Sequence, residues 1–251
     1  MIKAMLIDTS ACLSCNACTV ECKRENNVPL GRNIAWTKML TFEAGQYPQV
    51  KQYYMKKACN HCTEAACVEN CPVSAISHLP DGSVVIDQEK CIGCGMCVRS
   101  CPFGVPQIDE EARKSNKCTF CVHRTTNGGE TACSMACPFG AITFGERSEM
   151  LRLGKERVAA LQGQGNDKTN LYGETQMGGL HVLYVLEDSP SAYGLPEVSE
   201  QSAGTVLAGL WNKIVNRESV FAPLTTIALV TGLVIKNREA RLKREKEAEK
   251  A

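Results

Sequence analysis

The sequence predicts an α+β fold in which short strands and helical turns repeat around groups of cysteine. Three observations predict it. The chain has 251 residues and 16 cysteines, which form four groups of four, the last ending at Cys137. In three of the groups the last cysteine begins a Cys-Pro run, in the forms CPVSAI (71–76), CPFGVP (101–106) and CPFGAI (137–142). Aromatic residues make up only 6% of the chain, which is thin for a conventional apolar core.

The four groups share one spacing. Each begins with Cys-x2-Cys and ends with Cys-x3-Cys, and proline follows the last cysteine of every group except the first. Only the gap between the second and third cysteines varies. The groups are Cys12, Cys15, Cys18 and Cys22; Cys59, Cys62, Cys67 and Cys71; Cys91, Cys94, Cys97 and Cys101; and Cys118, Cys121, Cys133 and Cys137.

This spacing is typical of 4Fe–4S clusters. Two-residue gaps let the first three thiolates of a group surround one iron–sulfur cube, and the fourth ligates a neighbouring cube, as in two-cluster ferredoxins. Sixteen thiolates therefore predict four 4Fe–4S clusters, with all sixteen cysteines as metal ligands. Zinc and disulfides are the alternatives, but structural zinc favours separated Cys-x2-Cys pairs, and disulfide frameworks are typical of short secreted chains. Zinc would predict a colourless protein.

The composition excludes some functions. A net charge of +1 and a pI near 7.4 do not favour nucleic acid as a partner. No Gly-rich phosphate loop, catalytic triad or paired-carboxylate site is apparent, so we expect no catalytic residue. The first residues, MIKAMLIDTSAC (1–12), lack a basic segment followed by a long apolar run, so we expect no signal peptide there.

Local patterns predict the elements of the cysteine-rich part. The repeated unit consists of a strand, a ligand loop, a Cys-Pro turn and a second strand. Ser83 to Asp87 alternates as a strand after a turn at residues 80–82. Residues 23–58 insert a longer polar and aromatic segment. We expect a four-cluster domain of two bacterial-ferredoxin-like modules at 1–147, with an inner module at about 56–110 inserted in the outer one.

The chain after residue 147 has no cysteine. Residues 148–165 carry apolar side chains at roughly helical spacing and end in glycine, which predicts a short helix. The run HVLYVLE (181–187) predicts a strand, and the prolines and glycines of residues 188–208 indicate an extended surface arm. We therefore expect a helix, a strand and an arm over residues 148–216.

A single transmembrane helix is predicted at residues 217–237. The stretch from Ser219 to Ile235 has no charge and lies at the short end of the membrane-spanning range, with a buried core helix as the alternative. The tail at 238–251 is rich in Lys and Arg, whereas only Lys213 and Arg217 precede the helix. The positive-inside rule then predicts a cytoplasmic C-terminus and a cluster domain on the periplasmic or extracytoplasmic side. A plain solvated tail is the alternative.

Five longer runs carry a closer resemblance. They are CIGCGMCVRSCPFGVP (91–106), KCTFCVHR (117–124), CPFGAITFG (137–145), GGLHVLYVL (178–186) and YGLPE (193–197). With them the chain resembles the iron–sulfur (beta) subunit of membrane-bound formate dehydrogenase, within the four-cluster electron-transfer subunits of complex iron–sulfur molybdoenzymes. Iron–sulfur subunits of membrane-bound nickel–iron hydrogenases share this architecture and are the near alternative. The short terminal helix and the charged tail depart from the family.

The resemblance implies how the cysteines pair. The two outer groups share two clusters with each other, and the two inner groups do likewise. The implied sets are cluster 1 with Cys12, Cys15, Cys18 and Cys137; cluster 2 with Cys118, Cys121, Cys133 and Cys22; cluster 3 with Cys59, Cys62, Cys67 and Cys101; and cluster 4 with Cys91, Cys94, Cys97 and Cys71. Some relatives have Trp at the position of Cys97 and a three-iron cluster, so Cys97 predicts four complete cubes.

The resemblance also implies partners. A catalytic subunit with molybdenum or tungsten on a pterin cofactor would oxidise formate, and a membrane cytochrome b or similar quinone-reactive subunit would receive the electrons. In a hydrogenase the catalytic partner would be the nickel–iron large subunit. This chain would be a non-catalytic electron-transfer subunit, anchored in membrane lipid and exported with a signal-bearing catalytic subunit.

Other polar residues have two interpretations each. We expect His61 and His123 to form a hydrogen bond near a cluster or to be exposed, because four thiolates already complete each site. We expect His181 to be a satisfied residue at a strand edge, with contact to a quinone-reducing partner as the alternative. Three cations either raise nearby cluster potentials or are surface charges. They are Lys56, Lys57 and Arg99.

Overall fold

The computed structural model describes residues 1–31 and 34–198. The strands are β1 (Lys3–Asp8), β2 (Thr37–Gln46), β3 (Gln49–Ala58), β4 (Ile76–His78), β5 (Val84–Ile86), β6 (Gln107–Asp109), β7 (Lys114–Asn116), β8 (Ile142–Glu146), β9 (Asn170–Tyr172) and β10 (Val182–Leu186). The α-helices are α1 (Ala17–Glu25), α2 (Ala66–Glu69), α3 (Met96–Ser100), α4 (Val122–Thr125), α5 (Ala132–Met135) and α6 (Arg147–Gly163). Short 3-10 helices cover Thr9–Ala11, Gln176–Gly178 and Pro190–Tyr193.

The largest sheet joins the beginning of the chain to its later part. Its strand order is β8-β1-β10-β9, with β1 parallel to β10 and antiparallel to β8. The β1–β10 register pairs Met5 with Val182. Both central strands, KAMLID and VLYVL, are almost continuously apolar and buried, which is typical of strands covered on both faces.

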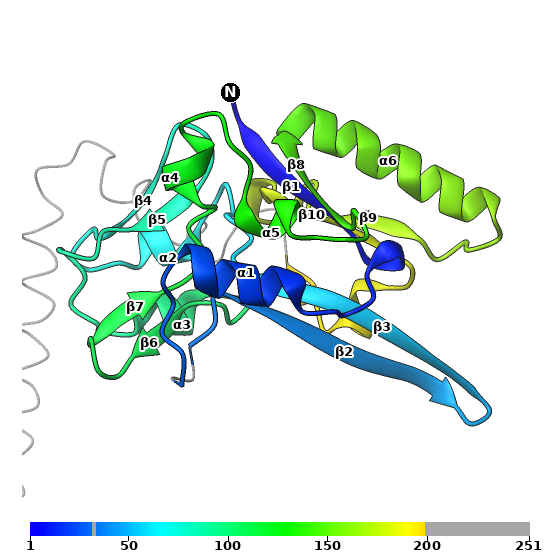
Figure 1. The fold of residues 1–251 in the computed structure, drawn as a ribbon, viewed down its shortest axis with the longest axis horizontal. Coiled ribbons are helices and arrows are strands. Elements are labelled where there is room, and N and C mark those ends of the chain that lie inside the picture. The colour runs from blue at the N-terminus through cyan, green and yellow to red at the C-terminus, as the bar shows by residue number, and fades with distance from the viewer. Residues whose placement is uncertain (32–33, 199–251) are drawn as a thin grey trace, which may run out of the picture. The chain divides into compact units, whose positions relative to one another are not determined.

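The two faces of this sheet meet different layers. Ala4 and Leu6 of β1 pack with Met150 of α6, and Figure 1 shows α6 lying over the sheet. Met5 and Ile7 alternate with them and belong to a second core that contains several of the predicted ligand cysteines. Strand β1 therefore separates an ordinary helix-on-sheet layer from a cysteine-rich core.

Strands β2 and β3 form a long antiparallel hairpin. The register runs from Thr37 opposite Ala58 to Gln46 opposite Gln49, and Figure 1 shows the turn projecting away from the other elements. The residues near the turn are exposed, whereas Tyr53 and the end of β3 are buried. The hairpin therefore brings the chain into the cysteine-rich core just before the second cysteine group.

The chain between the second and fourth cysteine groups forms a smaller layer. It contains α2, α3 and two hairpins, β4–β5 and β6–β7. At the β4–β5 turn Gly82 has φ +89°, and a Cβ there would lie 1.9 Å from Cε1 of His181. Nδ1 of His181 lies 2.8 Å from the Lys3 carbonyl oxygen, so this close approach seats the layer against β1.

Three expectations about secondary structure are confirmed. The strand expected at 83–87 is β5, the helix expected at 148–165 is α6, and the strand expected at 181–187 is β10. The fold has the expected mixture of helices and strands. Strand β10 and helix α6 pack with β1, and the described residues through Val198 belong to one compact unit. The domain boundary expected at residue 147 stays a prediction.

The surface arm expected at 188–208 differs in its described part, residues 188–198. A 3-10 helix forms at Pro190–Tyr193, and the Tyr193 side chain is fully buried. Its hydroxyl lies 3.0 Å from Thr9 Oγ1 and accepts a hydrogen bond from the Glu187 backbone N–H at 3.2 Å. Glycine and proline here mark a turn that returns to the core.

The predicted transmembrane helix at 217–237 and the charged tail at 238–251 lie outside the described residues. Within residues 1–31 and 34–198, no helix is both long enough and apolar enough to cross a bilayer. The transmembrane helix therefore stays a prediction.

Candidate metal centres

Four pockets in the described chain are each lined by four cysteines. In every pocket three cysteines come from one group, and the fourth is the last cysteine of another group. The Cys15 pocket has Cys12, Cys15, Cys18 and Cys137; the Cys22 pocket has Cys22, Cys118, Cys121 and Cys133; the Cys59 pocket has Cys59, Cys62, Cys67 and Cys101; and the Cys94 pocket has Cys71, Cys91, Cys94 and Cys97. These sets are the ones that the family resemblance implies, and metal ligation by them stays a prediction.

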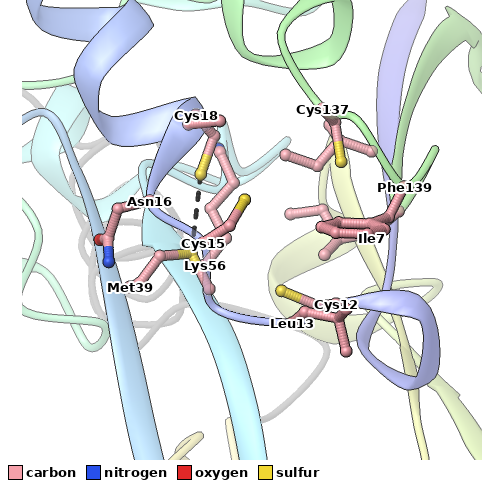
Figure 2. A pocket seen from close by; sticks show the side chains of 13 residues that line it. Ile7, Cys12, Leu13, Cys15, Asn16, Cys18, Met39, Lys56, Cys137 and Phe139 are labelled. Carbon is pink, nitrogen blue, oxygen red and sulfur yellow. Dashed lines mark hydrogen bonds between the residues drawn. The ribbon is translucent and has the colours of Figure 1, made fainter.

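The Cys15 pocket illustrates what such a site offers a cofactor. Figure 2 shows its four sulfur atoms around a common space. About 370 Å³ of this space is free of protein atoms, part of it open to solvent, and apolar residues such as Ile7 and Phe139 line it. Its described lining includes no carboxylate. Four thiols around such a space fit an iron–sulfur cube, because the iron and sulfide atoms lie between the thiols.

A short helix begins or contains the last Cys-x3-Cys of each group: α1 contains both cysteines, and in the other three groups the last cysteine lies one or two residues after the helix end. The x3 gap puts the two side chains four residues apart, one turn of helix, so they lie on the same side about 6 Å apart along the axis. On α1, Cys18 lines the Cys15 pocket and Cys22 lines the next one. Similarly, Cys133 on α5 lines the Cys22 pocket, and Cys137 just after α5 lines the Cys15 pocket. The Cys15 and Cys22 pockets are therefore neighbours, joined by two short helices.

The Cys59 and Cys94 pockets are related in the same way. Cys67 of α2 lines the Cys59 pocket, and Cys71 lines the Cys94 pocket. Cys97 of α3 lines the Cys94 pocket, and Cys101 lines the Cys59 pocket. Helices α2 and α3 pack against each other. The cysteine spacing thus produces two pairs of adjacent pockets.

The loop between the first two cysteines of each group has one backbone feature in common. The residue just before the second cysteine has a positive φ in all four groups: Ser14 (+53°), His61 (+46°), Gly93 (+69°) and Phe120 (+62°). Left-handed residues in such loops form anion-binding concavities from backbone N–H groups at many iron–sulfur sites. Here the Phe120 N–H donates a hydrogen bond to Cys118 Sγ at 3.4 Å. For residues with a side chain the left-handed conformation costs roughly 1–2 kcal/mol. Only Gly93 carries a sequence signal for it.

Burial raises the pKa of several of these thiols. The pKa of Cys22 is raised to about 11 and that of Cys67 to about 12, mainly because burial disfavours the charged thiolate. Without metal, these side chains are therefore protonated at neutral pH. Binding of metal must release protons, because the thiolate is the ligand.

The sixteen cysteines differ in exposure. All of them lie in the described residues, and only Cys15 and Cys94 are exposed. Exposed apolar side chains flank both, with Leu13 near Cys15 and Ile92 near Cys94. In the Cys22 pocket all four cysteines are buried, and in the Cys59 pocket all are partly buried. Two of the pockets are thus close to the surface.

Two lysines are buried among the pockets. Lys56 on β3 lines the Cys15 pocket, and Lys117 lines the Cys59 pocket. The Lys117 ammonium donates to the carbonyls of Val84 and Cys118. Burial by itself lowers the pKa of Lys56, whereas negative charge on the nearby cysteines, which are thiolates when they ligate metal, raises it. Lys117 was missed in the sequence, where one lysine beside a cysteine has no distinguishing pattern.

Of the three cations singled out in the sequence, only Lys56 is buried. Lys57 is half-buried and Arg99 is exposed, with its guanidinium against Met96. Of the two interpretations of Lys56, a surface charge or a cation near a cluster, its burial excludes the surface charge.

The three histidines singled out in the sequence, His61, His123 and His181, are outside the described lining of the four cysteine pockets. His61 is fully buried, and its Nδ1 accepts a hydrogen bond from the Val84 N–H at 2.9 Å. His123 contacts Glu25 at 2.9 Å near the surface. His181 is satisfied by the Lys3 carbonyl, as expected for a strand-edge residue. In the described ranges, no three Cys, His, Asp or Glu side chains converge on a position for a single metal ion.

Comparison with known proteins finds one matching family profile and several similar subunits. A family profile described as a 4Fe-4S dicluster domain matches residues 50–147. The formate dehydrogenase-O iron–sulfur subunit of Escherichia coli is 38% identical over 230 residues, which cover 84% of this chain and 77% of that protein. The formate dehydrogenase iron–sulfur subunit of Haemophilus influenzae is 38% identical over 213 residues, covering 77% and 68%. One of the subunits of tetrathionate reductase from Salmonella typhimurium is 34% identical over 187 residues, covering 74% and 73%.

Proposed function

Because this chain belongs to the family of formate dehydrogenase iron–sulfur subunits, we propose that its four cysteine pockets hold four 4Fe–4S clusters and form one electron relay. The chain is an electron-transfer subunit, as its relatives are, and contains a 4Fe–4S domain. The number of clusters and their ligands are the proposal. The observation that carries it is that every pocket has four cysteines, with three from one group and one from another.

The residues around each pocket have distinct roles in this proposal. The four cysteines would hold one cube, which when bound supplies a centre that gains or loses one electron. Apolar side chains such as Ile7 would limit the access of water to the cube, and backbone N–H groups such as that of Phe120 donate to ligand sulfurs. Lys56 and Lys117 contribute positive charge inside the protein. Burial, hydrogen bonds and charge are the means by which a protein adjusts cluster potentials.

The order of the relay follows from shared helices and from exposure. The Cys15 and Cys22 pockets share α1 and α5, and the Cys59 and Cys94 pockets share α2 and α3. Lys117 lines the Cys59 pocket and the next residue, Cys118, lines the Cys22 pocket, so these two pockets are neighbours. The proposed order is therefore the Cys15, Cys22, Cys59 and Cys94 pockets. Exposed Cys15 and Cys94 mark the two ends at which partners exchange electrons.

The proposed partner at one end is a catalytic subunit. The names of several relatives support a formate-oxidising subunit, which by the family resemblance would carry molybdenum or tungsten on a pterin. Another relative is a subunit of tetrathionate reductase, so similarity to these relatives does not by itself identify the substrate of the catalytic partner. A nickel–iron hydrogenase large subunit is the alternative.

The proposed partner at the other end is a membrane subunit. We propose that residues 217–237 cross the bilayer and that a cytochrome b or similar quinone-reactive subunit receives the electrons. The uncharged run from Ser219 to Ile235 and the basic residues after it support this placement. The cluster domain would then lie on the periplasmic or extracytoplasmic side.

Metal analysis of the native complex tests this function. The complex is purified in detergent, and iron, molybdenum, tungsten, nickel and zinc are measured per copy of this chain together with visible absorption. We expect about sixteen irons, four for each cube, in addition to any iron of the partners, with iron–sulfur absorption. A matched pair of variants is Cys94→Ala and Ser77→Ala, the second at an exposed position of β4. The first should lose about four irons and the second none.

Each result has one meaning. Molybdenum or tungsten with formate oxidation supports the formate dehydrogenase assignment, whereas nickel moves the assignment to a hydrogenase and leaves the relay intact. Zinc with little iron would overturn the relay. Formate oxidation by the isolated chain would overturn its role as an electron-transfer subunit.

A further inference from the structure

Lys56 is a cation in an unusual place. It lies near the end of β3, and only 1% of it is exposed, whereas the adjacent Lys57 is half-buried. Removing an ammonium group from water is unfavourable by several kcal/mol unless other groups compensate its charge. The surroundings of Lys56 must therefore supply that compensation.

The groups around Lys56 supply little of it without a cofactor. Within residues 1–31 and 34–198, the hydrogen-bond partner of its Nζ is the sulfur of Met5 at 3.7 Å, and no ion pair joins it to a carboxylate. A thioether is a weak acceptor. Lys117 differs, because two backbone carbonyls accept hydrogen bonds from its ammonium.

The elements packed against Lys56 present cysteines. Figure 2 shows Lys56 in the Cys15 pocket together with Cys18 of α1 and Met39 of β2. The sulfur of Met5, 3.7 Å from the Lys56 ammonium, belongs to a residue that also lines the Cys22 pocket with Cys118 and Cys133. Lys56 therefore lines one outer pocket and contacts the lining of the other.

We propose that Lys56 is a fixed cation shared by the clusters of the Cys15 and Cys22 pockets, and that its charge raises their reduction potentials. This inference rests on the proposed function, since it requires a cluster in each pocket. Reduction adds one electron to a cube whose thiolate ligands already make it anionic. A nearby buried positive charge therefore stabilises the reduced form more than the oxidised form.

The expected effect can be bounded from charge interactions in proteins. An opposite charge within about 4–6 Å shifts the ionisation equilibrium of a group by roughly one to three pKa units, that is, at least about tenfold. A tenfold change in a one-electron reduction equilibrium corresponds to about 59 mV. Removing the Lys56 charge should therefore lower the potentials of the two outer clusters by at least about this amount.

A redox titration of the purified complex tests the inference. Dithionite supplies single electrons through mediator dyes, and electron paramagnetic resonance follows each cluster signal in the wild type, Lys56→Met, Lys56→Arg and Lys57→Met. Methionine removes the charge at similar length, arginine retains it, and Lys57→Met makes the same change on the neighbouring residue. We expect two of the four potentials to fall in Lys56→Met and all four to stay near wild type in Lys56→Arg and Lys57→Met.

Iron content keeps every outcome interpretable. Loss of about four to eight irons in Lys56→Met with retention in Lys56→Arg also supports the inference, because the pocket then needs the charge to hold its cube. Equal loss of iron in both variants would overturn it in favour of a packing role. So would unchanged potentials in a fully loaded Lys56→Met, or the same shift in Lys57→Met. A wild-type complex without these clusters would instead overturn the proposed function.

Discussion

Replacement of Gly93 by alanine should be far more damaging than the same change at Gly95, two residues away in the same ligand loop. Both glycines have a left-handed backbone, with φ of +69° and +74°. A Cβ at Gly93 would lie 2.1 Å from the backbone oxygen of Arg113 and 2.9 Å from its carbonyl carbon. A Cβ at Gly95 meets nothing within 4 Å among the described residues. The pair therefore separates backbone strain from steric overlap.

The magnitudes follow from these two terms. The left-handed conformation costs an alanine roughly 1–2 kcal/mol at either position. At Gly93 the loop must also move away from Arg113, whose contacting atoms are backbone, and overpacking of this kind costs roughly 1–3 kcal/mol more. For a folded unit of about 150–250 residues, each kcal/mol lowers the thermal midpoint by about 2–4 °C. Gly93→Ala should thus melt at least about 2 °C below Gly95→Ala.

The assay follows thermal loss of iron–sulfur absorption in the purified complex, with iron content measured before heating. Gly93 lies between Cys91 and Cys94, so Gly93→Ala should also lose iron from the Cys94 pocket first. Gly95→Ala should keep its iron. Equal midpoints and equal iron content in the two variants would refute the reasoning, because the loop would then accept a side chain facing Arg113.

Two further predictions concern the fold. Tyr193→Phe removes the hydroxyl that meets Thr9 and the Glu187 N–H in the core, so it should lower stability by about 1–3 kcal/mol in thermal unfolding, whereas Tyr47→Phe at an exposed position should have no effect. Equal midpoints would show that the buried hydroxyl is dispensable. Burial lowers the pKa of His61 and His181 below 6.5. As the pH falls, the unfolded chain therefore binds protons at these histidines before the folded chain does. The stability that is present above about pH 6.5 is lost below it. Between about pH 7.5 and 5.5 the midpoint should fall less in His181→Gln than in the wild type, and parallel curves would contradict this.

The cysteine spacing predicted much about the candidate site because it reflects one helical turn. An x3 gap places the last two cysteines of a group one turn apart, so they face two adjacent pockets, as Cys18 and Cys22 do. The family resemblance, and not the spacing, predicted which cysteine groups share a pocket. Spacing alone cannot show that Cys137 lies beside Cys12, because that contact depends on how distant segments pack.

Other features could not be predicted from local sequence. The pairing of Met5 with Val182 depends on the whole intervening fold, and no local pattern indicates it. The left-handed backbone of Phe120 runs against the preference of a bulky side chain, so it is a consequence of the loop around the pocket. Burial of Lys56 also runs against the usual behaviour of lysine, which is almost never fully buried without a partner. These exceptions cluster around the cysteine pockets.

The helical turns that carry paired cysteines also determine where this chain can change length. Inserting one residue between Cys18 and Cys22 would rotate Cys22 by about 100° around α1 and direct its sulfur away from its pocket. The x11 gap between Cys121 and Cys133 contains no such constraint at residues 126–130, which are exposed. Evolution or an engineer could therefore lengthen that loop, for a tag or a contact with another protein, while every x3 gap must keep its length.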